Sequence, residues 1–429
     1  MVRKKFLSGI FFTVLITFPF IVNSQDGGTP TGNNRNDAVK VYLDCRRCDM
    51  NYTRREIPFV NYVRDVKEAE VYVLVTTQQA GNGGDQYTYT FSGQYDFEGM
   101  NDTLVYNTNP NQTRAEIREK STNMLELGLI RYVARTPLAD EISVTHNENL
   151  ETAEVKDRWN NWLFELETSP RFNTEESYKR IFLSNSLNIT KITPDIKLEI
   201  ELDQSINRQK FIEDSVTSIY TRSNKSIRTL FVKSLNDHWS AGLRVNVQSA
   251  TNPNYDLNLE VMPAVEYDIY PYSESTHKQL RINYSAGYQF SNYIDTTLFN
   301  KLKNELFRHE LRVAYQIQEK WGWINVSLSG SNYFHDWSKN RLELNGFIRL
   351  RILKGLSLSV NGEIAYINDQ LNLRKGDLSE AERLLRLKEQ ATNYSIGGSI
   401  GLSYTFGSIY NNVVNPRFDR GGGGFNRFY

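Results

Sequence analysis

The chain has 429 residues, and its 50 basic and 50 acidic side chains leave a formal net charge of zero at pH 7. This balance gives no support for a nucleic-acid partner or a polyanion-binding surface. The mean hydropathy of −0.52 argues against apolar membrane helices. The 25 Tyr and 22 Phe suit a membrane β-barrel, in which alternate residues face lipid and aromatic residues gather at the water–lipid boundaries.

The N-terminus has the pattern of a secretory signal peptide. Lys4 and Lys5 precede an apolar run over residues 6–22, and the sequence Val-Asn-Ser ends at Ser24. We expect residues 1–24 to be removed by cleavage after Ser24. A membrane-anchoring helix is the alternative, because the apolar run approaches the ~17 residues that span a bilayer. Residues 25–37 are polar and predict a flexible lead-in.

Residues 38–136 predict a compact periplasmic α/β domain. Alternating or continuous apolar runs predict four strands, and helical spacing predicts one helix over residues 54–66 and a second over 113–135. Thr113 and Glu116 form the capping-box pattern that starts the second helix. The expected order is β-α-β-β-β-α, with both helices on one face of the sheet. The predicted strands cover residues 39–43, 71–75, 87–91 and 102–106.

Cys45 and Cys48 are the only cysteines, in the sequence Cys-Arg-Arg-Cys. In an oxidising periplasm this spacing favours a small structural disulfide. A redox motif requires a thioredoxin-like context that the sequence lacks, and a metal site requires two further soft ligands.

After an expected linker at residues 137–158, residues 159–407 change to long alternating segments. Residues 341–352 are the clearest, with Leu and Ile on one face and Arg, Glu and Asn on the other. Repetition of this pattern predicts an antiparallel transmembrane barrel of about 12 strands. The predicted strands are residues 159–168, 178–192, 195–210, 225–236, 239–250, 256–270, 278–291, 304–318, 322–335, 340–353, 356–369 and 393–407.

The connections between these segments alternate in length. Outer-membrane barrels have short periplasmic turns and longer outer loops. Short turns are expected at residues 193–194, 237–238, 271–277, 320–321 and 354–355, and long loops at 211–224, 292–303 and 370–392. Only the turn at 271–277 is as long as some of the outer loops. Residues 378–391 of the last loop predict a helix that acts as a lid, a partner-binding face or a solvated charged helix. The Gly-rich and aromatic residues 408–429 are expected to form a periplasmic tail.

Many charged residues fall on the face of these strands that would line the lumen. Acidic residues prevail on the early strands and arginines on the later ones, which predicts either a transverse field in a pore or an ion-paired plug. The lumen candidates are Glu199, Glu201, Asp203, Glu260, Glu266, Asp268, Arg281, Arg308, Arg312, Arg341, Arg349 and Arg351.

A catalytic site at the outer rim is the least favoured alternative. His335 and Asp336 lie near an expected outer loop, but adjacent residues on a strand point to opposite faces. His309 lies in the lipid-facing register. The sequence contains no nucleophile elbow, phosphate loop or zinc spacing, so we expect no catalytic residue, cofactor or metal.

Several stretches resemble uncharacterised outer-membrane β-barrel proteins of Bacteroidota. They are residues 42–45, 56–65, 73–76 and 410–418. The resemblance implies a periplasmic domain before a barrel. Residues 69–135 also resemble, by element order, the N-terminal domain of the Tol-system propeller protein and the curli-secretion lipoprotein core, which implies periplasmic protein contacts.

These observations predict a non-catalytic outer-membrane barrel whose periplasmic domain contacts a partner in envelope transport or organisation. A small-solute channel with a charged lumen is the first alternative, and an outer-rim hydrolase is the second. The expected partners are outer-membrane lipid and a periplasmic or outer-membrane protein, without nucleic acid. Both the N-terminal domain and the C-terminal tail are expected in the periplasm.

Overall fold

The computed structural model describes residues 37–81, 83–109, 112–141, 159–213, 216–377, 379, 387–408, 410 and 412. The expected signal peptide, residues 25–36 of the lead-in, residues 142–158 of the linker and the tail after residue 412 lie outside the described residues. So does most of the expected loop helix, although its described residues 387–391 are not helical.

The N-terminal domain is a five-stranded mixed sheet with two α-helices. The sheet order is β2-β1-β3-β4-β5; β1 is parallel to β2 and β3, and the other pairs are antiparallel. The elements are β1 (Lys40–Cys45), α1 (Met50–Glu56), β2 (Asn61–Tyr62), β3 (Val71–Gln79), β4 (Asp85–Gly93), β5 (Asn101–Asn107) and α2 (Arg114–Val133), with 3-10 turns at Val66–Glu68, Tyr95–Phe97 and Pro137–Glu141.

One face of this sheet packs against the helices and forms the hydrophobic core. Val73 and Phe91 pair across β3 and β4, and both are fully buried with Leu125 and Leu129 of α2. The α2 helix begins with the predicted capping box, in which the Thr113 and Glu116 side chains each bind the other residue's backbone N–H. The predicted second helix and the four predicted strands are therefore confirmed.

The predicted helix over residues 54–66 is wrong. The first helix lies earlier, because the Asp49 side chain accepts a hydrogen bond from the Tyr52 backbone N–H and caps it. Pro58 disfavours helical geometry in the residue before it, and the helix ends at Glu56. Apolar residues after that point instead form the short strand β2, which pairs with β1.

The second unit is a twelve-stranded antiparallel sheet in which every strand pairs with its neighbours in sequence. This confirms the predicted strand count and antiparallel pairing. The strands are β6 (Trp162–Thr174), β7 (Tyr178–Ile192), β8 (Ile196–Glu213), β9 (Val216–Ser234), β10 (Trp239–Ala250), β11 (Tyr255–Asp268), β12 (Lys278–Tyr293), β13 (Lys303–Glu319), β14 (Gly322–Tyr333), β15 (Asp336–Leu353), β16 (Leu356–Ile367) and β17 (Tyr394–Tyr404).

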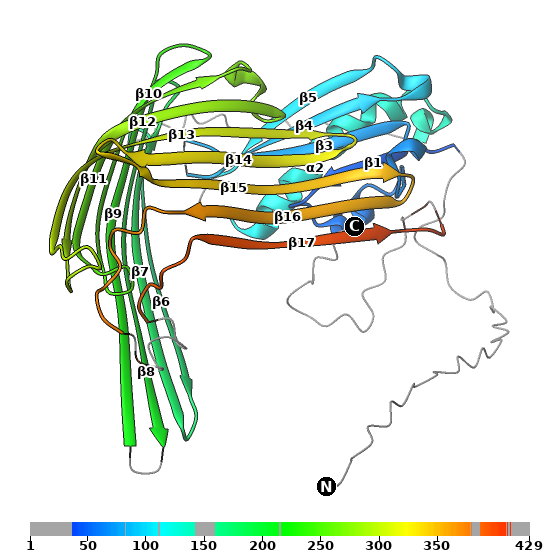
Figure 1. Ribbon diagram of the computed structural model, residues 1–429. Helices are drawn as coiled ribbons and strands as arrows, with labels where there is room; N and C mark the ends of the chain where they lie inside the picture. The colour runs from blue at the N-terminus through cyan, green and yellow to red at the C-terminus, as the bar shows by residue number, and fades with distance from the viewer. Residues whose placement is uncertain are drawn as a thin grey trace, which may run out of the picture.

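The predicted long loop at residues 211–224 is wrong, because β8 and β9 continue through most of it. Phe211 lies between the rings of Tyr178 and Tyr220, at centroid distances of 5.1 and 6.0 Å. These contacts extend the hairpin beyond β10, whose last partner on β9 is Asn224. The strands β6–β9 therefore project from the rest of the sheet, and we call this projecting part the paddle, residues 169–174, 178–184, 205–213 and 216–224 (Figure 1).

The sheet is open, which differs from the closed barrel expected from the sequence. The strands β6 and β17 each have one neighbour and form its two edges. Alternation of side chains determines which face of a strand is apolar, but it does not determine whether the two edge strands meet. Figure 1 shows the sheet strongly bent, with β6–β9 running in a different direction from β14–β17.

The strand registers place chemically different residues on the two faces of this sheet. The apolar face carries Leu342, Leu344 and Ile348 of β15, and the polar face carries Arg341 and Arg349 of the same strand. The pairing preserves this division through all twelve strands. Within the described part of the chain, neither helix has the length and hydropathy needed to cross a membrane.

Candidate functional site

The polar face of the large sheet collects the charges that the sequence predicts to line a lumen. All twelve candidates lie on this face: Glu199, Glu201 and Asp203 on β8; Glu260, Glu266 and Asp268 on β11; Arg281 on β12; Arg308 and Arg312 on β13; and Arg341, Arg349 and Arg351 on β15. The period-two pattern was sufficient to place them together.

Most of these charges have close partners of opposite sign. Arg308 lies 3.7 Å from Glu260 and 4.0 Å from Glu310, and Arg312 lies 3.0 Å from Glu310. Arg341 lies 2.9 Å from both Glu343 and Asp369. These pairs reduce the field that two walls of opposite sign would create.

Sequence reasoning did not place Arg228 in this network. Arg228 of β9 lies 2.7 Å from both Glu201 and Asp203. Its segment runs Leu230, Phe231 and Val232 together, so alternation did not show which face it occupies. A positive charge therefore lies within the wall that the sequence suggested to be acidic.

The remaining candidate carboxylates accept hydrogen bonds on the same face. Glu199 pairs with Lys197 at 2.9 Å, and Glu266 accepts from the Asn283 side chain at 3.3 Å. Asp268 accepts from the backbone N–H groups of Tyr270 and Leu280 at 3.2 and 3.1 Å. Asp268 therefore stabilises a short turn of the sheet.

The second face of the N-terminal sheet lies against the short-turn end of the large sheet (Figure 1). Asp44 of β1 forms a 2.8 Å ion pair with Arg351 of β15, and it accepts a hydrogen bond from the Tyr72 hydroxyl at 3.0 Å. The Arg351 guanidinium also lies 5.1 Å from the centre of the Tyr42 ring. Burial in this contact raises the pKa values of the Tyr42 and Tyr72 phenols.

Two further acidic residues of the domain bind the turn between β15 and β16. The Asp65 carboxylate accepts from the Gly355 backbone N–H at 2.7 Å, and Glu68 forms an ion pair with Lys354. Together with Asp44, these acidic residues form an acidic edge that meets basic residues of the large sheet. We call this contact the junction.

The β3–β4 hairpin extends the junction to the early strands. Thr90 lies 3.2 Å from the His277 ring nitrogen, and the Gln78 amide donates to the Ser275 hydroxyl at 3.3 Å. At the tip, a Cβ added to Gly81 would overlap the backbone carbonyl of Ile192, the last residue of β7. The close approach requires glycine there.

The opposite edge of the N-terminal sheet contacts the chain that follows β17. Val63 and Tyr410 form an isolated antiparallel bridge, and Asn412 accepts from the Tyr62 backbone N–H at 2.6 Å. The junction therefore reaches from the end of β7 to the segment after the last strand.

The disulfide loop directs one arginine into the polar face. Cys45 and Cys48 form a disulfide with a Cα–Cα distance of 5.5 Å. Arg46, within this loop, places its guanidinium 3.7 Å from the Trp323 ring centre, which suits a cation–π contact. Burial lowers the Arg46 pKa. Sequence reasoning identified the cysteines but not the arginine between them.

At the other end of the large sheet, the loop after β16 crosses to the loops of β10–β13. Arg374 lies 3.0 Å from Asp295 and donates to the Asn254 side chain at 2.9 Å. Asn372 donates to Glu389 at 2.6 Å and to the Pro253 carbonyl at 3.0 Å. In the strand order, β12–β15 lie between β16, which precedes this loop, and β11, which follows Pro253 and Asn254. We call the described residues of this crossing loop, 368–377, 379 and 387–393, the loop cap.

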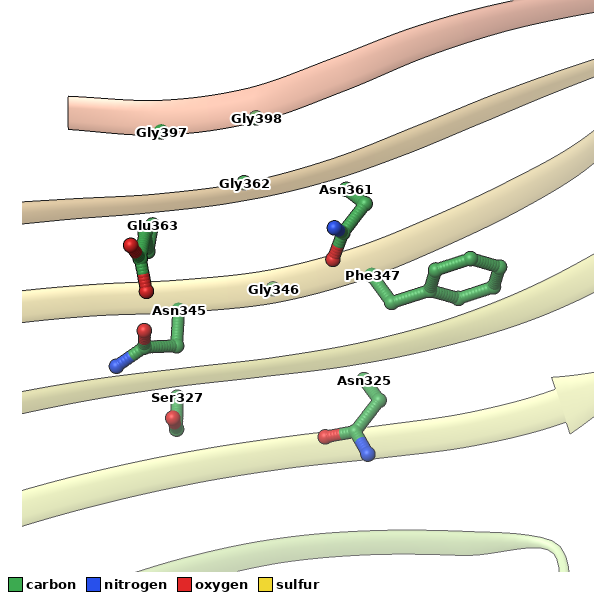
Figure 2. A pocket seen from close by; sticks show the side chains of 10 residues that line it. All are labelled: Asn325, Ser327, Asn345, Gly346, Phe347, Asn361, Gly362, Glu363, Gly397 and Gly398. Carbon is green, nitrogen blue, oxygen red and sulfur yellow. The ribbon is translucent and has the colours of Figure 1, made fainter. Parts of the chain in front are cut away.

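A polar hollow with a volume of about 510 Å³ lies on β14–β17. Figure 2 shows the residues that line it. Its side chains include three amides, one carboxylate and one aromatic ring, and glycines of β15–β17 form part of its wall. The lining residues are Asn325, Ser327, Asn345, Gly346, Phe347, Asn361, Gly362, Glu363, Gly397 and Gly398. Trp323, which contacts Arg46, packs with its ring centre 4.7 Å from that of Phe347, so the hollow adjoins the junction.

The residues weighed for catalysis make other contacts. Asp336 accepts from the Ser338 hydroxyl at 2.6 Å and from its backbone N–H at 3.0 Å. The His335 ring packs 5.8 Å from Tyr333, and the His309 ring packs 4.8 Å from Phe334 on the apolar face. The described residues contain no group of three His, Cys, Asp or Glu arranged to hold a metal ion.

A scan against protein-family models finds no match for this chain, and a search of curated proteins also finds none. The function is therefore inferred from the geometry described above.

Proposed function

We propose that the large sheet closes into a transmembrane β-barrel in the outer membrane, and that the N-terminal domain caps its periplasmic end. The observation that carries this proposal is the exposed apolar face. Phe172, Leu166 and Ile400 are 84%, 79% and 79% exposed, and large apolar residues are exposed on every strand of the sheet. A continuous apolar surface of this size marks a lipid or protein contact.

The height of the apolar face suits a bilayer. On β15 the apolar residues run from Leu342 to Ile352. Ten strand steps of about 3.4 Å, tilted by about 40°, give roughly 26 Å, which is near the apolar band of outer-membrane barrels.

Closure follows from the cost of unpaired backbone groups in hydrocarbon. Each unpaired N–H or C=O group costs several kcal/mol in lipid, so the free edges of β6 and β17 favour pairing with each other. The strands have 13 and 11 residues, and they run in opposite directions because neighbouring strands alternate. Antiparallel pairing of β6 with β17 therefore satisfies both edges.

The junction favours an anchored envelope protein over a permanently open pore. The domain covers the short-turn end, and the loop cap crosses the other end. Ion pairs occupy much of the polar face between them. We therefore propose a non-catalytic barrel whose periplasmic domain contacts a protein partner in envelope transport or organisation. The resemblance to Bacteroidota barrels fits the same location.

A gated channel for small solutes is the second candidate, and the polar hollow favours it. The side chains of Asn325, Asn345 and Asn361 make no hydrogen bond to another described residue, so they are available to a polar solute. Arg46 of the N-terminal domain contacts Trp323 beside this hollow. Docking or undocking of the domain would therefore affect the hollow.

The barrel is tested by disulfide crosslinking across the proposed seam in native envelopes. In a Cys45→Ser/Cys48→Ser background, Leu166→Cys is combined in turn with Ile396→Cys, Ile400→Cys and Leu402→Cys. We expect one combination to crosslink efficiently and the protein to remain in the membrane fraction. Leu166→Cys with Leu344→Cys, on remote β15, is the control. A protein found in the aqueous fraction, or a seam that never crosslinks, would refute closure in the membrane.

A further inference from the structure

The paddle carries a cluster of cations on the apolar face of the sheet. Lys179 of β7 lies directly opposite Lys210 of β8, and Arg208 lies opposite Ile181 on the same two strands. We call Lys179, Arg208 and Lys210 the basic patch. In the described residues, none of the three has an ion pair or a side-chain hydrogen bond.

The register leaves this patch without a compensating carboxylate. Like charges directly opposite each other in an antiparallel pair destabilise it, because their Cβ atoms lie about 5 Å apart. The apolar face of β6–β10 carries no Asp or Glu among its described residues. Its cations are Lys179, Lys191, Arg208, Lys210, Lys225 and Lys233. The repulsion between Lys179 and Lys210 therefore favours an anion from outside the chain.

The patch also lies beside exposed apolar side chains. Phe172 and Ile181 are 84% and 60% exposed, and Ile219, which is opposite Lys210, is also exposed. A small anion would satisfy the cations but would leave these side chains in water. An anion attached to acyl chains satisfies both.

The position along β8 places the patch at the edge of the membrane. Apolar residues run from Ile196 to Ile206 on this face with one interruption, at Gln204, and Arg208 and Lys210 follow directly. Ten steps cover roughly 26 Å at a tilt of about 40°, so the cations begin where the apolar band ends. Lys and Arg at that depth reach lipid headgroups.

We propose that the basic patch, on the lipid-facing surface of the barrel, binds the phosphate of a membrane lipid headgroup. This inference rests on the proposed membrane location and identifies one lipid-binding surface within it. Two or three cations around one phosphate supply charge-assisted hydrogen bonds, and the neighbouring apolar side chains contact the acyl chains.

The test measures lipid selectivity of the full chain in phosphatidylcholine vesicles. Electron paramagnetic resonance compares immobilisation of spin-labelled phosphatidic acid with that of spin-labelled phosphatidylcholine. We expect wild type to prefer phosphatidic acid, and Lys179→Gln/Arg208→Gln/Lys210→Gln to reduce that preference by at least about fivefold, the contribution of one cation near a charged surface.

The control is Arg171→Gln/Arg180→Gln/Arg222→Gln, which removes three cations from the polar face of the same paddle. It should leave the preference unchanged. Equal preference in wild type and the patch variant, or an equal loss in the control, would overturn the proposal. Displacement of the labelled lipid by inorganic phosphate, but not by chloride of matched ionic strength, would assign the site to a free anion and also overturn it. If neither wild type nor any variant inserted into the vesicles, that result would refute the membrane location instead.

Discussion

Asp44 and Arg351 form a 2.8 Å ion pair although 307 positions separate them in the sequence. Arg351 is held on one side by this carboxylate and on another by the Tyr42 ring. One contact thus joins the first strand of the small domain to a late strand of the large sheet.

Asp44→Asn should loosen the junction. The substitution removes the charge that neutralises a largely buried Arg351, and it should cost about 2 kcal/mol of docking free energy. Limited proteolysis of the full chain in membranes should cut the 137–158 segment faster. Asp85→Asn, which removes an exposed partner of Arg47 on the same domain, is the control. Equal cleavage rates in wild type and Asp44→Asn would contradict a docked domain.

Gly81→Ala should displace the β3–β4 hairpin from the sheet. The added Cβ overlaps the Ile192 backbone carbonyl, and backbone atoms in a strand pair cannot move aside cheaply. Hydrogen exchange in residues 76–90 should rise. Gly362→Ala, whose Cβ would meet its nearest atom at an ordinary 3.5 Å, should leave exchange in that hairpin unchanged.

Tyr89 should make the N-terminal domain sensitive to alkaline pH. Burial raises the pKa of Tyr89 to about 12, while its hydroxyl donates to Ser121 at 2.8 Å. The folded state favours the neutral phenol, so this contribution is complete below the unfolded value near 10 and is lost as pH rises through about 12. Hydrogen exchange of β4 should accelerate over that interval. Tyr89→Phe should show a smaller acceleration over the same interval, and an identical profile would exclude this phenol as the cause.

The loop cap and the junction should block the lumen of the proposed barrel in series. Arg374→Ala removes the contacts to Asp295 and Asn254, but the docked domain still covers the other end. In planar bilayers, Arg374→Ala and Asp44→Asn alone should therefore be silent, and the double variant should conduct.

Lys375→Ala with Asp44→Asn is the matched control, because among the described residues the Lys375 side chain binds only Asn300. This combination should stay silent. A steady current through wild type would show that the two covers do not close the lumen and would favour the channel.

The alternation of residues was sufficient to predict twelve strands and the face of every candidate charge. It failed at residues 211–224, where the aromatic contacts of Phe211 extend a hairpin that polar composition had suggested to be a loop. The continuous apolar run at residues 71–75 correctly predicted a buried strand in the small sheet. It gave no sign that Tyr72 and Leu74 are covered by the large sheet, because their partners lie far away in the sequence.

The 307-residue separation also has a consequence for the order of assembly. The small domain leaves the ribosome first and has its own core, whereas its acidic edge meets Arg351 and Lys354 only after the late strands exist. Docking through this edge therefore cannot precede the formation of β15 and the turn after it. Until then the edge remains uncovered, and its covering marks a large sheet whose late strands are in place.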